Sequence, residues 1–246
     1  PKKTWRKNWG CLKKRNPKRL VKSSEKNKTS GPTGTPIGVK TPEILKKKPR
    51  KSQKGNPVRI IAGRHRGRLL DAPAGQTTRP TSDRAREGLF NMLAHGGYGQ
   101  NGSPVFNDAD ILEAFAGTGA FSLEALSRGA HSATLLDLDQ SALAVARANA
   151  ETLGEGDATH IISMDATQPR IATMAHDVVF LDPPYGSELG TEALIQLAQQ
   201  GWIKDHALVV IEIGAKETFE PPNGFTEIKE RSFGAARFVI MAYQSD

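Results

Sequence analysis

The sequence has few of the residues that build disulfides, metal centres or membrane spans. Its single cysteine, Cys11, excludes an intramolecular disulfide and suits a reducing compartment. The six histidines are scattered without metal-site spacing, and no apolar run approaches the roughly 20 residues that cross a bilayer. No apolar stretch follows the basic N-terminus, so we expect no secretory signal. These absences favour a soluble, cytoplasmic protein without membrane or metal partners.

Basic residues are concentrated in the first 57 positions. This segment holds 19 of the 34 Lys and Arg residues but only two acids, Glu25 and Glu43, so it carries +17 while residues 58–246 carry −9. It is rich in Lys, Pro, Gly, Ser and Thr and lacks periodicity, so we expect a disordered tail. Such a tail can bind phosphate backbones without sequence specificity, or it can be a solvated extension. Both interpretations stay open.

From Val58 the pattern changes to that of a folded domain, which we place at 58–246. Residues 58–73, VRIIAGRHRGRLLDAP, predict two short strands around Gly63 and Gly67 with the arginines pointing outward. Residues 77–96 then predict a helix capped by Thr81 or Ser82, which ends at His95-Gly96-Gly97. We therefore expect an N-terminal hairpin and helix over 58–100, followed by a core over 108–246.

Strands and helices alternate through the core. The apolar segments 109–116, 132–139, 159–166, 176–185 and 207–213 read as strands, with helices at 120–129, 140–154 and near 188–200 between them. Residues 225–233 and 236–243 read as a closing hairpin. This order predicts an α/β fold with a mostly parallel, seven-stranded, Rossmann-like sheet covered by helices on both faces. Ligands of such sheets bind at the carboxyl ends of the strands.

The first core strand ends in a glycine turn, EAFAGTG. Gly117 and Gly119 allow a sharp turn close to a ligand, before a helix that presents free N–H groups. Alone, G-x-G is a weak signal that also begins dinucleotide-binding folds. Glu113 precedes the turn, however, and would repel a pyrophosphate but pair with a cationic amino-acid ligand. This favours S-adenosylmethionine over a nicotinamide or flavin cofactor.

Carboxylates also follow the next two strands. Asp137 is placed to accept hydrogen bonds from ribose hydroxyls, and Asp139 lies on the same face if the strand continues. Asp139 can equally cap the following helix. After the third strand, Asp165 can accept from an adenine amino group while Ala166 donates its N–H, although Asp165 can instead be a cap. The predicted cofactor residues are Glu113, Phe115, Gly117, Thr118, Gly119, Asp137, Asp139, Asp165 and Ala166.

The decisive motif follows the fourth core strand, at Asp182-Pro183-Pro184-Tyr185. Two prolines remove two N–H donors and fix the direction of the carbonyl oxygens. Tyr185 can stack on a planar base, while Asp182 and a backbone carbonyl accept hydrogen bonds from an exocyclic amine. These hydrogen bonds would polarise the amine and orient its lone pair toward a methyl donor. A simple Pro-Pro strand stop is the alternative, which this position disfavours.

Together these motifs resemble the class I amino-methyltransferases. The blocks VRIIAGRHRGRLLDAP, RPTSDRAREGLFNML and LSRGA resemble the bacterial small-subunit rRNA guanine-N2 methyltransferases (RsmD-like) more closely, over 58–246. The resemblance implies S-adenosylmethionine as cofactor, guanine N2 of 16S rRNA as acceptor with guanine 966 as the target, and a small ribosomal subunit or its assembly intermediate as partner. It places the RPTSDRARE segment over the cleft. The basic tail and the FGAAR sequence near the C-terminus depart from the family pattern.

Seven arginines between 59 and 86 predict a basic face beside this edge of the sheet. Arginine suits bidentate phosphate contacts, which position RNA without reading its bases, although a solvated hairpin would look similar. The predicted RNA contacts are Arg64, Arg66, Arg68, Arg79, Thr81, Arg84 and Arg86.

Three other functions compete with guanine-N2 methylation. An N6-adenine methyltransferase would use the same amine grip, but the N-terminal arginine blocks argue against it. A non-catalytic RNA-binding assembly factor would not need an intact glycine turn and DPPY motif. A nicotinamide oxidoreductase would leave DPPY without a role. We expect a monomeric enzyme, and we assign no role to Asp110 or Glu212.

Overall fold

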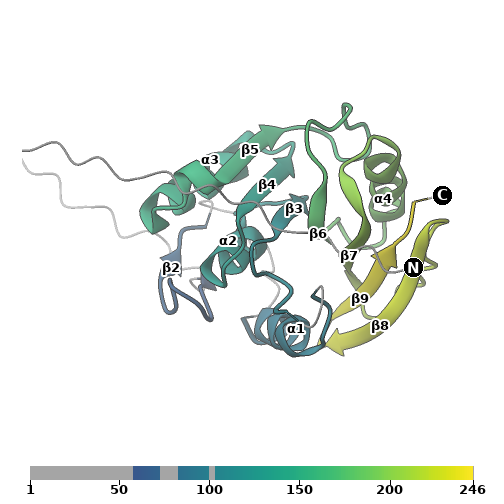
Figure 1. Ribbon diagram of the computed structural model, residues 1–246, viewed down its shortest axis with the longest axis horizontal. Coiled ribbons are helices and arrows are strands. Elements are labelled where there is room, and N and C mark those ends of the chain that lie inside the picture. Colours follow the sequence, from purple (N-terminus) through teal and green to yellow (C-terminus); the bar gives the residue numbers. More distant parts are fainter. Residues whose placement is uncertain (1–57, 73–82, 100–102, 246) are drawn as a thin grey trace, which may run out of the picture. The chain divides into compact units, whose positions relative to one another are not determined.

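A computed structural model describes residues 58–72, 83–99 and 103–245, all within the unit Arg50–Asp246. The basic tail, Arg79 and Thr81 lie outside the described residues. The core is a seven-stranded sheet in the order β5-β4-β3-β6-β7-β9-β8 (Figure 1). Its strands are β3 (Asp110–Ala114), β4 (Ser132–Asp137), β5 (Thr159–Ser163), β6 (His176–Leu181), β7 (Ile203–Gly214), β8 (Phe225–Phe233) and β9 (Ala236–Tyr243).

Strands β3 to β7 run parallel, while β9 and β8 close the sheet as an antiparallel hairpin. Helices α1 (Asp83–His95), α2 (Ala120–Ser127), α3 (Gln140–Leu153) and α4 (Leu189–Gln199) join and cover the strands, and a short 3₁₀ turn spans Gly156–Ala158. The predicted α/β architecture, with a mostly parallel seven-stranded sheet, is confirmed.

The two faces of the sheet bury separate apolar cores. Alternate strand residues such as Ile111 and Val178 pack under α1, α2 and α3, whereas their neighbours Leu112 and Val179 pack under α4. Side chains alternate across a strand, so a strand buried on both faces must be apolar throughout. This is why the core strands read as near-continuous hydrophobic runs.

A small hairpin precedes the sheet and contacts α2 and α3. Strands β1 (Val58–Arg59) and β2 (Leu69–Leu70) contain only two residues each, so most of the predicted hairpin is turn rather than strand. Gly63 has φ +82°, and a Cβ there would lie 1.9 Å from the Ser127 carbonyl oxygen. Only glycine allows this approach to the end of α2.

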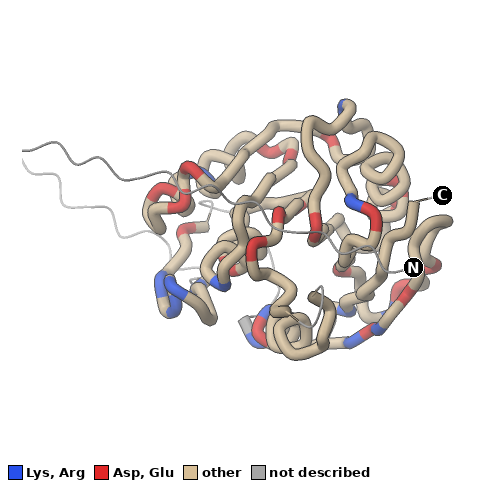
Figure 2. Tube along the Cα trace, viewed as in Figure 1, with Lys and Arg blue, Asp and Glu red and all other residues tan. Residues whose placement is uncertain are grey.

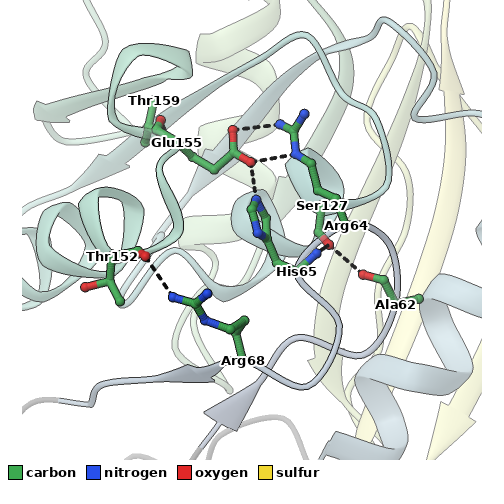
Figure 3. Close-up of polar contacts among 8 residues, drawn as sticks. All are labelled: Ala62, Arg64, His65, Arg68, Ser127, Thr152, Glu155 and Thr159. Carbon is green, nitrogen blue, oxygen red and sulfur yellow. Dashed lines mark hydrogen bonds and ion pairs between the residues drawn. The ribbon is translucent and has the colours of Figure 1, made fainter.

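Buried Glu124 holds the hairpin in place. Its two carboxylate oxygens accept hydrogen bonds from the backbone N–H groups of Ile61 (2.6 Å) and Ala62 (3.0 Å). Ser127 adds a bond from its hydroxyl to the Ala62 carbonyl, 2.6 Å (Figure 3). The hairpin is therefore attached to α2 through the backbone groups of Ile61 and Ala62.

Helix α1 covers the part of the sheet near β8. Leu89, Phe90 and Leu93 are fully buried, as the predicted apolar face requires, and the helix ends at His95. Among the described residues, no helix is both long and apolar enough to span a bilayer. Nor does this part of the chain gather three or more side chains able to hold a metal ion.

Candidate active site

Three carboxylates lie on one face of the sheet, at the carboxyl ends of β3, β6 and β7. Glu113 pairs in register with Phe180, and Leu181 pairs with Ile211, which places Asp182 beside Glu212. The Asp182 N–H donates to the Ala114 carbonyl at 3.3 Å, which extends the ladder by one residue. All three acids therefore belong to the face covered by α1, α2 and α3.

Glu113 is buried beneath the first turn of α2. Its carboxylate accepts hydrogen bonds from the N–H groups of Ser122 (2.9 Å) and Phe121 (3.3 Å). Burial, the largest cause, raises the pKa of the Glu113 carboxyl to about 7; the bonds from Ser122 and Phe121 oppose this shift, and the charge of Asp137 adds to it. Near neutral pH this carboxyl is therefore balanced between its two forms, and a nearby cation would favour the charged one.

The glycine turn after β3 is tightly constrained. Gly119 has φ +72°, and a Cβ there would lie 2.5 Å from Leu135 Cδ2. Gly117 has φ +52° with open space where its Cβ would be. Phe115 adopts φ +58°, an uncommon conformation for a bulky residue and one that recurs at ligand sites. The turn therefore leaves the Gly117 backbone open to a ligand, while Gly119 serves packing.

Asp137 stabilises the same turn from β4. One carboxylate oxygen accepts from the Gly117 N–H at 2.7 Å and the other from the Asp139 N–H at 2.8 Å. Asp139 instead caps α3, because its carboxylate accepts from the N–H groups of Ser141 and Ala142. Asp139 therefore acts as the cap of α3 and its contact with the cofactor stays a prediction, while Asp137 lies against the glycine turn.

Asp165 lies in a turn after β5 rather than at the start of a helix. Its Oδ1 atom accepts from both the N–H and the hydroxyl of Thr167, at 2.9 and 2.7 Å. Ala166 is buried among the residues on the α4 face of the sheet. The turn holds the Asp165 carboxylate in a defined orientation at the edge of the sheet.

Asp182 begins the DPPY segment directly after β6 and is exposed at the surface. Desolvation, then repulsion by Glu212 and Glu113, raises the pKa of Asp182 well above its ordinary value of 3.8. A carboxyl with a raised pKa accepts a proton more readily than an ordinary aspartate. Asp182 can thus both orient an amine and take a proton from it.

Tyr185 is 46% exposed, but its hydroxyl points back to the sheet. The hydroxyl donates a hydrogen bond to Glu212 Oε1 at 2.5 Å. Glu212 lies on β7 and is only 1% exposed. Desolvation and this bond raise the pKa of the Tyr185 hydroxyl above its ordinary value. The bond fixes the hydroxyl end of the ring and leaves part of the ring surface available for stacking.

Glu212 is a site residue to which the sequence analysis assigned no role. The motif VVIEI looks like an ordinary buried strand, and only its register beside Asp182 reveals the carboxylate. A signal was present, since an acid within an apolar parallel strand rarely lacks a partner.

A hollow of about 730 Å³ adjoins the DPPY segment on its α4 side. It is lined by Tyr185 and by residues of α4, β7 and the turns beside them, including Glu188, Glu192, Glu212 and Glu217. Its acidic lining does not suit a phosphate backbone. None of the predicted cofactor residues lines it, so the cofactor-type strand ends and this hollow are separate features.

The arginines of the hairpin are exposed, as predicted, and Arg64 and Arg68 contact the protein itself. Arg64 makes a bidentate pair with buried Glu155, with both N–O distances 2.7 Å, and the same carboxylate contacts His65 (Figure 3). Arg68 donates to the Thr152 carbonyl at 3.0 Å. Glu155, which the sequence analysis did not single out, thus joins the hairpin to the end of α3.

The two described α1 arginines differ sharply. Arg84 is exposed, whereas Arg86 is buried and donates to the Arg59 carbonyl at 2.7 Å. The expectation that Arg86 contacts RNA is corrected, because its guanidinium joins α1 to the hairpin. Periodicity alone could not show this contact, which links residues 27 positions apart.

Comparison with known proteins decides which fold family this geometry represents. The family described as "Conserved hypothetical protein 95" matches residues 58–242. The Escherichia coli K12 protein "Ribosomal RNA small subunit methyltransferase D" is 41% identical over 166 residues, which are 68% of this chain and 79% of that protein. The chain belongs to the RsmD family.

Two further comparisons agree with this RsmD-family membership. The Haemophilus influenzae protein of the same name is 34% identical over 185 residues, covering 74% of this chain and 91% of that protein. The solved structure of Escherichia coli yhhF has a TM-score of 0.65 at 34% identity, covering 77% of this chain and 99% of that one. The RsmD-family chain is thus a class I methyltransferase, and its cofactor is S-adenosylmethionine.

The residues at the strand ends fit this cofactor. S-adenosylmethionine carries a cationic amino-acid end and a ribose with two hydroxyls. Asp137 accepts from the Gly117 N–H, Glu113 accepts from the N–H groups at the start of α2, and the space where a Gly117 Cβ would lie is open. A third carboxylate, Asp165, stands at the next strand end. The set of acceptors suits a cation and hydroxyls rather than a pyrophosphate.

Proposed function

We propose that this chain methylates the exocyclic N2 amine of a guanine in small-subunit (16S) ribosomal RNA. The observation that carries the proposal is the Asp182-Pro183-Pro184-Tyr185 segment, which places a carboxylate of raised pKa and a partly exposed aromatic ring at the ligand edge of a methyltransferase sheet. The family relatives, which are named for rRNA small-subunit methylation, support the choice of RNA. The family resemblance favours guanine 966 and a small-subunit particle as substrate.

The proposed cofactor contacts are Glu113, Phe115, Gly117, Thr118, Gly119, Asp137, Asp139, Asp165 and Ala166. When bound, S-adenosylmethionine supplies an electrophilic methyl group on a sulfonium sulfur. Glu113 favours the cationic amino-acid end, Asp137 accepts from the ribose hydroxyls, and Asp165 accepts from the adenine amine. Phe115 and the glycine turn leave the backbone accessible to the ligand.

The acceptor base is held by the other half of the site. Tyr185 stacks on the base while its hydroxyl stays bonded to Glu212. Asp182 and a proline carbonyl accept hydrogen bonds from the amine, which directs the nitrogen lone pair at the methyl group. The bound cofactor would supply its methyl group to this nitrogen, and its sulfur would leave as a neutral thioether. The nitrogen then loses a proton, which Asp182 accepts because its pKa is raised.

Asp182→Asn tests this mechanism while preserving side-chain shape. We expect kcat to fall by roughly 100- to 1,000-fold, because one oriented acceptor and the proton acceptor are lost together. S-adenosylmethionine affinity should stay within about twofold, since the substitution adds no bulk. Asp157→Asn, at an exposed position of the 3₁₀ turn, is the matched control.

The pH dependence of kcat provides a second test with the same variant. Wild-type kcat should fall as the pH drops through the raised pKa of Asp182, because the protonated acid cannot accept the amine proton. Asp182→Asn should lack this acidic limb. Near-wild-type turnover by the variant would contradict the assigned role.

Guanine and adenine both offer an exocyclic amine to this grip, so an N6-adenine product is the outcome that would change the substrate. Action as a monomer in the cytoplasm stays a prediction. The predicted RNA contacts that also stay predictions are Arg64, Arg66, Arg68, Arg79, Thr81 and Arg84.

A further inference from the structure

The edge strand β8 separates its charges by face. Lys229 and Arg231 pair with Ile240 and Phe238 of β9, residues that belong to the core beneath α1 to α3. Glu227 and Glu230 pair with Met241 and Val239, which belong to the opposite core. The register shifts between Glu227 and Lys229, within this stretch. The basic side chains of β8 therefore lie on the same sheet face as Asp182, and the acidic ones on the other.

Helix α1 meets this basic face through a glycine. A Cβ on Gly88 would lie 2.3 Å from the ring of Phe233, so glycine allows the helix to approach the end of β8 closely. Arg84 and Met92 lie one turn before and after Gly88 and so share its side of the helix. Arg84, which is exposed, thus brings a third cation to the junction of α1 and β8.

A hollow of about 370 Å³ lies at this junction. It is lined by Gly88, Met92, Lys229, Arg231 and Phe233. No acidic residue lines it, and within the described ranges no ion pair occupies Lys229 or Arg231. Figure 2 shows basic residues along β8 and at α1, apart from those of the hairpin. The groove therefore combines two exposed cations with an apolar floor.

The register of the sheet relates this groove to the active site. Arg231 pairs with Phe238 of β9, and Phe238 pairs with Glu212 of β7. Arg231 thus lies in line with Glu212, two strands away on the same face. Adjacent strands are about 4.8 Å apart, so the two backbones are separated by about 10 Å. A nucleic-acid strand whose base reaches Tyr185 has its backbone within range of this groove.

We propose that the groove between α1 and β8 binds the phosphate backbone of the substrate RNA, with Lys229 and Arg231 as the contacts and Arg84 at its rim. The proposal rests on the function proposed above. It adds a second phosphate site to the hairpin arginines, on the opposite side of α1 from the hairpin contacts of Arg86. The two cationic surfaces then hold the RNA on both sides of the base that stacks on Tyr185, while the acidic hollow beside α4 repels the phosphates.

The double variant Lys229→Gln/Arg231→Gln tests this site. Its matched control is Arg147→Gln/Arg170→Gln, which removes the same charge from exposed positions of α3 and the loop after β5. Binding to full-length small-subunit rRNA is measured against salt concentration. Each phosphate contact contributes about 0.7 to 0.9 to the slope of log affinity against log salt. The groove variant should therefore lose about 1.4 to 1.8 from the slope. If the variant and wild type bind equally at 1 M salt, the variant should bind roughly 25- to 60-fold more weakly than wild type at 0.1 M salt.

The same preparations are assayed for S-adenosylmethionine binding, thermal unfolding and methylation of small-subunit particles. We expect cofactor binding and thermal unfolding to be unchanged in every variant. Only the groove variant should show a reduced salt slope. Arg231→Lys should keep most of the slope because it keeps the charge. If wild type methylates the particles while the groove variant matches the control in slope and affinity, the groove proposal is overturned and the proposed function stands. If wild type neither binds nor methylates the RNA, the proposed function itself is overturned.

Discussion

Replacing Glu113 by Gln removes the charge of a carboxyl that is buried between β3 and the start of α2. Its pKa in the folded protein is about 7, against 4.5 as an ordinary glutamate. The folded state therefore binds this proton more tightly than the unfolded chain. The stability contributed by the neutral carboxyl is complete below pH 4.5 and is lost as the pH rises through 7.

The magnitude follows from the size of this shift. A difference of about 2.5 pKa units corresponds to about 3 kcal/mol, most of which is lost between pH 5 and pH 8. Glu113→Gln keeps an oxygen that can accept from the Ser122 N–H but does not titrate. The free energy of unfolding of wild type, minus that of the variant, should thus fall by about 2 to 3 kcal/mol over this interval.

Urea unfolding of both proteins at pH 5, 6, 7 and 8 measures this difference, with Glu151→Gln on the exposed side of α3 as the control for loss of one acid. Saturating S-adenosylmethionine should flatten the dependence, because a cation near Glu113 favours its charged form. A wild-type-minus-variant difference that stays constant with pH, or rises with it, would refute the reasoning about Glu113.

Two further substitutions test the supports of the site. Gly119→Ala should destabilise the protein by about 1 to 3 kcal/mol and weaken cofactor binding, because φ is +72° and the new Cβ would contact Leu135 at 2.5 Å. Chemical unfolding measures the stability and calorimetric titration measures the binding. Unchanged stability and binding would contradict the packing role of Gly119. Glu155→Gln should lower the free energy of unfolding by about 1 to 3 kcal/mol, because it breaks the ion pair with Arg64. Protease cleavage near the hairpin should become faster under conditions in which the core stays folded. An unchanged cleavage rate would show that the hairpin does not depend on this pair.

Most of the sheet could be predicted from the sequence because local patterns encode it. A strand such as β6 is an apolar run with a Pro-Pro stop, and α3 is an amphipathic helix that ends at a glycine. The carboxyl-end rule for parallel sheets then predicts that Glu113, Asp137 and Asp182 lie at one edge of the sheet.

Other features depend on contacts between distant residues, and local patterns do not record these. The burial of Arg86 needs the hairpin carbonyl of Arg59, and the role of Glu212 depends on the register between β6 and β7. Asp139 shows a related limit, since its spacing suits a ligand and a helix cap equally well. The charge separation on β8 likewise appears only when the register with β9 is known.

Identification of the methylated nucleoside tests the central claim most directly. Wild-type protein and Asp182→Asn are incubated with labelled S-adenosylmethionine and small-subunit rRNA particles, with DNA as a second acceptor, and the digested products are analysed by mass spectrometry. The account predicts N2-methylguanosine from the particles with wild type, and a loss of roughly 100-fold or more with Asp182→Asn. N6-methyladenine, or no product from any acceptor by a wild-type protein that binds the cofactor, would contradict it.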